Sequence, residues 1–355
     1  MALGRGYALT VSLRVLSPAP RDVWNELIDA DPRALISHTP RWTDIVCAVT
    51  GARDVSRLYE FGDGTRLVLP LVRATRSPYP LEASFPAAWG FGGVIGAEPS
   101  AQQLREVVED LRSRPLVRTR VRPNPLSGSI WREGASRGTT TIARRAHVLD
   151  IRDGFDAVWR HGFSKGARSA VRRAERLGVD VELDTSGRLG TVFRTLYDRS
   201  VERWARRQHE PLQLARWRAR RREPLEKFTE LPRRLGSAGR LWVAWTDGRP
   251  AAAIFVLQGR NAHYTRGAMD EELAGRTRAS YLLQSLAIED ACRAGCRWYH
   301  MGESGLSRGL AQFKEALGGR PVDYSEYLLE RLPVNRFDDG ARTIAKRALR
   351  FRDEG

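Results

Sequence analysis

Hydrophobic residues recur along this chain with two periods, one typical of amphipathic helices and one typical of half-buried strands. In the segment 277–294, apolar side chains at positions 279, 282, 283, 286, 287 and 291 share one face of a helix. Similar spacing predicts helices over 19–30, 38–51, 101–112, 155–161, 164–177 and 189–207. Strands are predicted over 12–16, 58–61, 66–72, 116–122, 139–151, 241–245, 251–258, 262–267 and 324–332, with a short aromatic strand at 298–300.

The second half of the chain therefore follows the order β-β-β-α-β-α-β, which is the core order of the acetyltransferase (GNAT) fold. The first half gives a fainter version of the same order, and 355 residues are enough for two separate cores. We predict an α/β protein with mixed sheets, built from two tandem GNAT-like domains packed side by side. The predicted domains span 1–150 and 151–334, the second carrying the active-site motifs, and 335–355 is predicted to be a basic, packed C-terminal helix.

The most informative stretch is 298–319, W-Y-H-M-G-E-S-G-L-S-R-G-L-A-Q-F-K-E-A-L-G-G. A strand, a glycine-bearing loop and a helix place Lys314 at the carboxyl end of a sheet, where α/β proteins usually bind ligands. Its ammonium group is thus a candidate oxyanion partner, although most lysines are simply solvated. Only four of the 59 Lys and Arg residues are lysines, namely Lys165, Lys227, Lys314 and Lys346, which favours a chemical role for Lys314.

The formal charge of +17 and a pI near 10.7 predict attraction to polyanions such as nucleic acid, although the bias towards arginine also fits a compositional preference of the genome. Cys47, Cys292 and Cys296 are too few for a disulfide framework, and the sequence has no cluster with zinc-ligand spacing. No stretch approaches the roughly 18 apolar residues of a membrane span. We therefore expect a soluble, cytoplasmic protein without a metal.

Two basic segments are candidate anion sites. In the helix at 164–177, Lys165, Arg168 and Arg172 recur three and four residues apart, which suits a phosphate chain or a solvated face equally well. The segment 203–222 combines arginines with Trp204 and Trp217, a composition that suits stacking on unpaired bases but also an ordinary helix surface over buried tryptophans.

Several motifs together resemble the FemABX-like aminoacyltransferases of the two-domain GNAT-like superfamily. The matching segments are S-K-G-A-R-S-A-V-R-R-A-E-R-L-G-V (164–179), Y-T-R-G-A-M-D (264–270), A-S-Y-L-L (279–283), G-C-R-W-Y-H-M-G-E-S (295–304), G-L-A-Q-F-K-E-A-L-G-G (309–319) and, more weakly, H-T-P-R-W-T-D-I-V-C-A-V-T-G (38–51). The F-K-x-x-x-G element is the most specific of these. The long coiled-coil arm of some members is not evident, since 203–234 is short and contains three prolines.

This resemblance implies transfer of an amino acid from charged tRNA to an amine, with Lys314 stabilising the developing charge and Phe313 beside it in the substrate site. The missing arm favours relatives that act on peptides or natural-product intermediates.

Tyr264, Arg266, Glu303 and Ser304 lie at strand ends that are expected to converge near Lys314. Glu303 is a candidate proton acceptor for the amine, and Tyr264 a candidate group to orient the ester. Alternatively, Tyr264 is a core residue and Glu303 pairs with an arginine.

The segment before the helix at 277–294 bears on coenzyme A. It reads E-L-A-G-R-T-R-A-S, with Gly275 as its single glycine, whereas a pyrophosphate loop needs several bare backbone N–H groups. We therefore predict an aminoacyl-tRNA-dependent aminoacyltransferase that uses charged tRNA as co-substrate, acts on a small amine or peptide and requires no bound cofactor. An acyl-CoA N-acyltransferase is the first alternative, and a non-catalytic RNA-binding protein is the second.

Overall fold

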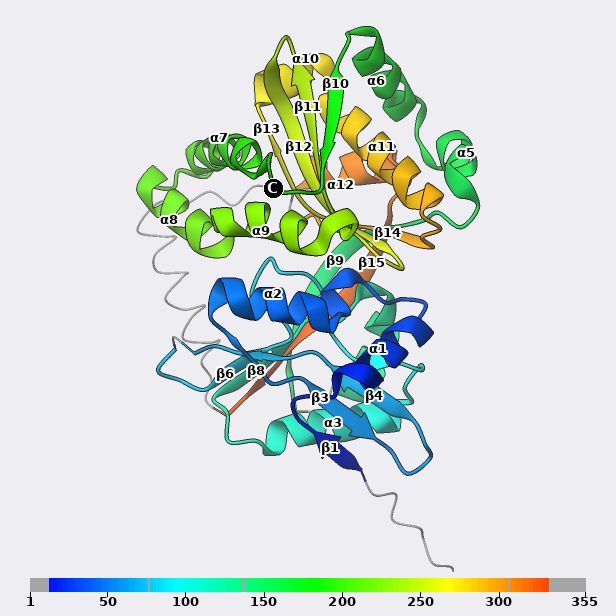
Figure 1. Ribbon diagram of the computed structural model, residues 1–355, viewed down its shortest axis with the longest axis vertical. Coiled ribbons are helices and arrows are strands. Elements are labelled where there is room, and N and C mark those ends of the chain that lie inside the picture. Colours follow the sequence, from blue (N-terminus) through cyan, green and yellow to red (C-terminus); the bar gives the residue numbers. More distant parts are fainter. Residues whose placement is uncertain (1–12, 76, 136–137, 306, 332–355) are drawn as a thin grey trace, which may run out of the picture.

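The computed structural model describes residues 13–75, 77–135, 138–305 and 307–331 (Figure 1). The helix predicted at 335–355 lies outside these residues. Two units are stacked along the long axis of the molecule, each combining helices with β-structure (Figure 1). The predicted mixed α/β class and the side-by-side arrangement of two similar domains are confirmed.

The strands of the described residues form two sheets. The smaller sheet has the order β1 (Arg14–Leu16), β3 (Arg57–Glu60), β4 (Arg66–Leu69), β7 (Ile95–Gly96). The larger sheet runs through both units in the order β10 (Asp180–Asp184), β11 (Gly239–Thr246), β12 (Arg249–Gln258), β13 (Ala262–Met269), β14 (Trp298–Glu303), β9 (Thr140–Asp150), β15 (Arg320–Glu330), β8 (Arg118–Val121), β6 (Leu81–Ala83), β5 (Val72–Arg73), β2 (Arg53–Asp54).

Two long strands, β9 and β15, join the units. They pair with each other in antiparallel fashion from Arg320 opposite Val148 to Leu328 opposite Thr140. Strand β9 also pairs with β14 of the second unit, whereas β15 also pairs with β8 of the first. Each unit therefore contains a strand from the other half of the sequence. The predicted boundary at residue 150 falls at the end of a shared strand, and the domain limits 1–150 and 151–334 remain predictions.

Helices cover both faces of the sheet in the second unit. On one face lie α7 (Gly190–Gln208), α8 (Leu212–Arg222) and α9 (Leu225–Leu235), and on the other lie α6 (Lys165–Arg176) and α11 (Ala279–Arg293) (Figure 1). The remaining helices are α1 (Arg21–Ala30), α2 (Pro40–Thr50), α3 (Ala101–Ser113), α4 (Gly128–Ala135), α5 (Gly154–Ala157), α10 (Glu271–Thr277) and α12 (Arg308–Ala316).

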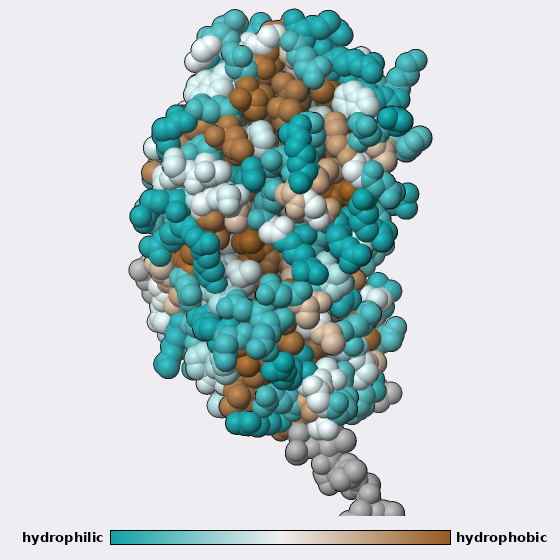
Figure 2. All heavy atoms as spheres, turned by 45° about the vertical axis from the view of Figure 1, so that its right-hand side comes forward, coloured by the Kyte–Doolittle hydropathy of each residue, from teal (hydrophilic) through white to brown (hydrophobic). Residues whose placement is uncertain are grey.

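Helix α6 shows why the sequence folds in this way. Its apolar residues Ala167, Val171 and Ala174 recur at helical spacing and are buried against α11. The opposite side of α6 is basic and exposed, and Figure 2 shows hydrophilic side chains interspersed with hydrophobic patches on this side of the molecule. No helix in the described part of the chain is long and apolar enough to cross a membrane.

Candidate active site

A cleft opens where two neighbouring parallel strands separate. Strands β13 and β14 pair only at Ala262 with Tyr299 and at His263 with His300. Beyond these pairs, β13 follows β12 through a bulge at Thr265, while β14 follows β9 through an irregularity before Gly302, where the glycine has a φ of 69°. Beyond these pairs the two strands are no longer joined by hydrogen bonds, and a space opens between them. Side chains from both faces of the sheet line this space.

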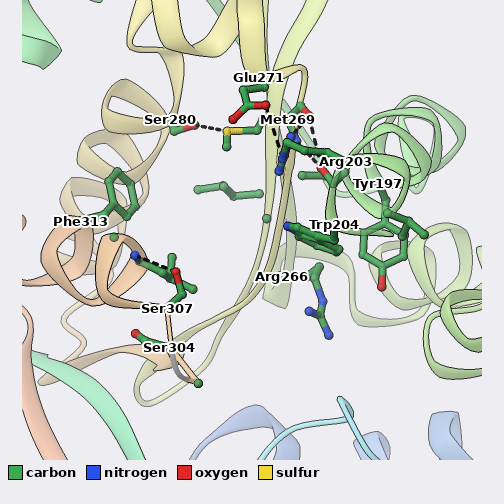
Figure 3. Close-up of a pocket in the computed structure, with 18 of the residues that line it drawn as sticks. Tyr197, Arg203, Trp204, Arg266, Met269, Glu271, Ser280, Ser304, Ser307 and Phe313 are labelled. Carbon is green, nitrogen blue, oxygen red and sulfur yellow. Dashed lines mark hydrogen bonds and ion pairs between the residues drawn. The ribbon is translucent and has the colours of Figure 1, made fainter. Parts of the chain in front are cut away.

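The cleft has a volume of about 970 Å³. One wall comes from β14, α11 and α12 and includes Phe313 and Ser304, whereas the opposite wall comes from α7, α8 and β13 and includes Trp204 and Arg266 (Figure 3). A cleft of this size, lined by aromatic rings and charged groups, is a candidate substrate site.

Lys314 is buried beside this cleft rather than solvated, with only 1% of its surface exposed. Helix α12, capped at its N-terminus by the side chain of Ser307, carries Lys314 in its last turn. The Nζ atom donates hydrogen bonds to the carbonyl oxygens of Gly302 (3.0 Å) and Glu303 (2.7 Å). Burial lowers the pKa of Lys314 to about 7, and the charge of Arg266 lowers it further, against the opposing effect of Glu303. Two of the Nζ protons are therefore engaged by carbonyl oxygens, and Lys314 lines the cleft.

The motif glycine that follows Lys314 has a steric role. Gly318 adopts a left-handed conformation with a φ of 84°, and a Cβ atom there would lie 3.0 Å from the Cα atom of Gly162. A glycine at this position therefore lets α12 end closely against the start of the segment that leads into α6.

Glu303, the last residue of β14, also lines the cleft. Its Oε1 atom accepts a hydrogen bond from the hydroxyl group of Tyr324 and lies 4.0 Å from Nε of Arg122. Burial, and then the negative charge of Glu303, raise the pKa of Tyr324 well above its usual range, which keeps the phenol as a donor. The arginine partner of Glu303 is therefore present, and the carboxylate is also bonded to Tyr324.

Ser304 is buried at the edge of the cleft, and its Oγ atom lies 3.2 Å from Nδ1 of His147. The second ring nitrogen of His147, Nε2, lies 3.4 Å from Oε1 of Glu315. His147 belongs to β9, about 160 residues away in sequence, and no local motif indicated this contact.

Arg266 lies on the opposite wall and is anchored from behind. Its Nη2 atom donates a hydrogen bond to Glu223, and the other carboxylate oxygen of Glu223 accepts one from Nζ of Lys227 at 2.7 Å. Lys227 is 1% exposed and also donates to the carbonyl oxygen of Ala88 in the first unit, at 2.5 Å. This second buried lysine was missed, although the scarcity of lysine in the sequence was a signal for it as well.

Tyr264 and Phe313 complete the predicted set around Lys314. Tyr264 lines the cleft, and burial raises its pKa to about 12, with Arg266 opposing this shift. Its hydroxyl group lies against Gly267, where a Cβ atom would approach the oxygen to 2.2 Å. Phe313 packs edge-on against Tyr281, with ring centroids 4.8 Å apart.

The wall formed by α7, α8, β13 and α10 is rich in arginine. The arginines that line the cleft are Arg203, Arg207, Arg218, Arg222, Arg266 and Arg278, while the lining carboxylates are those of Glu210, Glu271 and Glu303. Burial lowers the pKa of Arg222, and the adjacent charge of Arg266 lowers it further. In the described part of the chain no carboxylate lies within 4 Å of the Arg222 guanidinium group. This wall therefore offers positive charge to an anionic group.

The structure does not bring Lys165, Arg168 and Arg172 into the cleft. All three lie on α6, on the other side of α11. Arg168 donates hydrogen bonds through Nη1 to the carbonyl oxygens of Trp159, Arg160 and Phe163, and Arg172 lies 5.8 Å from the ring centroid of Trp159. Arg168 thus bonds to the backbone of the preceding helical turn, so its guanidinium group is not a free cation on this face of α6.

The segment between β13 and α11 contains the helix α10. Asp270 caps α10 by accepting a hydrogen bond from the backbone of Leu273, and Thr277 bonds back to the carbonyl oxygen of Leu273. The helix ends at Arg278, which has a φ of 60°. In a pyrophosphate loop the backbone N–H groups would be free to bind the ligand, whereas here some of them form hydrogen bonds within α10.

Among the residues the structure describes, no group of three or more His, Cys, Asp or Glu side chains is placed to hold a metal ion.

Comparisons with known proteins agree with this architecture. Residues 161–315 match the family model of the acetyltransferase (GNAT) domain. The fold is similar to that of FemX, with a TM-score of 0.54 and 13% identity over 89% of this chain and 97% of that chain. A conserved protein of unknown function from Bacteroides thetaiotaomicron VPI-5482 is similar with a TM-score of 0.52 and 8% identity, over 90% of this chain and 99% of the other.

A third similar structure is the C-terminal domain (DUF2156) of a putative lysylphosphatidylglycerol synthetase from Agrobacterium fabrum. Its TM-score is 0.50 at 12% identity, covering 94% of this chain and 98% of that domain. A search of curated proteins by sequence finds no match. At these identities the structural similarities show the fold alone, and this fold agrees with the predicted resemblance.

Proposed function

Since the chain carries a GNAT-type acyltransferase domain within a FemX-like fold, we propose that it transfers an aminoacyl group from charged tRNA to a small amine or peptide. The observation that carries this proposal is the buried Lys314, held at the carboxyl end of β14 and facing a wall rich in arginine. A positive group in a dry site is suited to stabilise an oxyanion, and clustered arginines are suited to the phosphates of a polynucleotide.

The proposed reaction needs neither a metal nor a covalent enzyme intermediate. The amine attacks the ester carbonyl carbon, a C–N bond forms, and the carbonyl oxygen becomes an oxyanion that accepts a hydrogen bond from Lys314. An alkylamine enters mainly as an ammonium ion, because its pKa in water is about 10. The carboxylate of Glu303 attracts this ion and accepts the proton that it loses before attack. Collapse of the intermediate breaks the C–O bond and releases the 3′ oxygen of tRNA.

The remaining predicted residues have supporting roles in this proposal. Arg266, fixed by Glu223, and Tyr264 orient the donor, while the Phe313 ring packs against the acyl group. Trp204 on the same wall as Arg266 offers a ring on which the terminal base can stack.

The donor is tested with a mixture of ATP, amino acids, synthetases and tRNA, a broad panel of amines, and the purified protein. Product formation is expected to stop when ribonuclease digests the tRNA. Product that continues after complete digestion would refute the donor. No product under any condition would favour the RNA-binding alternative, provided that the protein binds tRNA in a gel-shift assay.

An acyl-CoA-dependent N-acyltransferase is the second candidate, favoured by the description of the matching family as an acetyltransferase domain. Helix α10, which stands where a glycine-rich loop would be wanted, weighs against it. This enzyme would ignore ribonuclease and would depend on an added thioester.

A further inference from the structure

Ser304, His147 and Glu315 form a chain of polar groups from the cleft to the surface. Ser304 lines the cleft, the imidazole of His147 is 1% exposed, and the side chain of Glu315 is 50% exposed. The distances are 3.2 Å from Oγ to Nδ1 and 3.4 Å from Nε2 to Oε1. The three groups come from the end of β14, from β9 and from α12, so tertiary structure alone assembles them.

The direction of the hydrogen bonds among these three groups follows from Glu315, the exposed end of the series. Glu315 is half exposed and its carboxylate oxygen accepts hydrogen bonds, so the neutral imidazole places its proton on Nε2 and donates it to Glu315. Nδ1 is then left with a lone pair, which accepts a hydrogen bond from the Ser304 hydroxyl group. A serine hydroxyl backed by an imidazole and a carboxylate is arranged to exchange protons with a reacting group.

We propose that Ser304, His147 and Glu315 form a proton relay for the acyl transfer, which rests on the function proposed above. The amine nitrogen carries a second proton after attack, and it gives this proton to Oγ of Ser304 while Oγ passes its own proton to Nδ1 of His147. The resulting imidazolium ion is stabilised by the carboxylate of Glu315. When the C–O bond breaks, Nδ1 returns a proton to Oγ, and Oγ protonates the leaving oxygen.

The relay balances, since the second amine proton ends on the leaving group and Ser304, His147 and Glu315 regain their resting state, while Glu303 releases the first proton to solvent. It also explains why a serine is placed beside Glu303, which handles the earlier proton. The relay matters most for an oxygen leaving group, because an alkoxide needs a proton to leave whereas a thiolate does not.

His147 is available as a base at neutral pH. Burial lowers the pKa of His147, the charges of Lys314 and Arg145 lower it further, and the contact with Glu315 raises it. The relay therefore fails when pH falls below the His147 pKa, and this sets an acidic limb in the profile of kcat against pH. Because Glu315 raises that pKa, Glu315→Gln is expected to move the limb to lower pH.

The experiment compares Ser304→Ala, His147→Gln and Glu315→Gln with the wild type, using whichever acyl donor gives turnover. We expect kcat to fall by about 10²-fold or more in Ser304→Ala and His147→Gln, with little change in KM, and less in Glu315→Gln. The control is Glu289→Gln, which removes a carboxylate paired with Arg293 on α11 and is expected to leave kcat and the acidic limb unchanged. Thermal unfolding checks that each variant is folded.

A second readout needs no substrate. Nitrogen NMR of His147 is expected to show the proton on Nε2 and a pKa below 6.5 that falls further in Glu315→Gln. A resting proton on Nδ1, or an acidic limb that stays in place in Glu315→Gln, would overturn the relay. An acyl adduct on Ser304 in the mass spectrum of quenched enzyme would also overturn it, since Ser304 would then be a nucleophile. Turnover with a thioester alone would refute the tRNA donor but would leave the NMR and pH tests of the relay intact.

Discussion

Replacing Lys314 with methionine separates the chemical role of this residue from its structural role. Methionine has a similar length and fills the same buried space but offers no donor. It removes the hydrogen bonds from Nζ to the carbonyl oxygens of Gly302 and Glu303, and with them the donor that we propose for the oxyanion. Arg308→Met, which removes an exposed cation from the same helix, is the matched control.

The expected loss of activity follows from the oxyanion role that we propose for Lys314. Removal of one preorganised donor typically costs about 10²- to 10³-fold in kcat, equivalent to about 3–4 kcal/mol. We expect this loss for Lys314→Met and a kcat within about twofold of the wild type for Arg308→Met, since exposed helix substitutions have small effects. Only the protonated ammonium can serve, so the wild-type rate is expected to fall as pH rises through about 7.

The effect on stability is small at neutral pH because two larger contributions oppose each other. A pKa lowered from 10.5 to about 7 corresponds to roughly 5 kcal/mol of cost for burying the charge, at about 1.4 kcal/mol per pH unit. Methionine removes this cost but leaves two carbonyl oxygens without donors, at roughly 1–3 kcal/mol each. The free energy of unfolding at pH 7 is therefore expected to change by only about 1–2 kcal/mol.

The dependence on pH is a sharper test, because these opposing contributions do not hide it. Between pH 7 and 10.5 the unfolded chain binds a proton at Lys314 that the folded protein has largely lost, so wild-type stability rises with pH in this window. From pH 7 to pH 9 the wild type is expected to gain about 2 kcal/mol relative to Lys314→Met. Urea unfolding of both proteins at these pH values measures the difference. A constant difference, or near-normal turnover of Lys314→Met, would refute the assignment.

Two other perturbations are informative. Arg222→Gln is expected to weaken binding of tRNA and to reduce the slope of log affinity against log salt by about 0.7–0.9, which corresponds to the loss of one phosphate contact. The control is Arg168→Gln, because the guanidinium group of Arg168 bonds three carbonyl oxygens. This control is expected to lower stability without changing the slope. An unchanged slope for Arg222→Gln would remove the arginine-rich wall from the binding site. Gly318→Ala is expected to lower the free energy of unfolding by about 1–3 kcal/mol, because Gly318 has a φ of 84° and lies against Gly162. The control is Gly166→Ala, which is not expected to destabilise, because no atom lies closer than 3.8 Å to the Cβ position there. Equal stabilities of the two variants in urea unfolding would contradict this reasoning.

The sequence by itself determined the elements and the local part of the site. Hydrophobic period depends only on neighbouring residues, so it located α6, α7, α11, β12 and β13 within a few residues. The scarcity of lysine and the F-K-x-x-x-G motif pointed to Lys314, and the order of elements placed Tyr264, Arg266, Glu303 and Ser304 at one edge of a sheet. The structure brings these residues to one cleft.

Tertiary structure alone decided how distant segments meet. Both β9 and β15 looked like ordinary strands, and nothing local indicated that each would pair with strands of both units. The contacts of His147 with Ser304, and of Lys227 with Ala88, span more than 130 residues, and no sequence spacing encodes them. Spacing in the sequence predicts that one face of α6 carries Lys165, Arg168 and Arg172. The direction in which this face points depends on how α6 packs against α11. Periodicity fixes which side chains share a face, whereas packing of the whole chain fixes what that face meets.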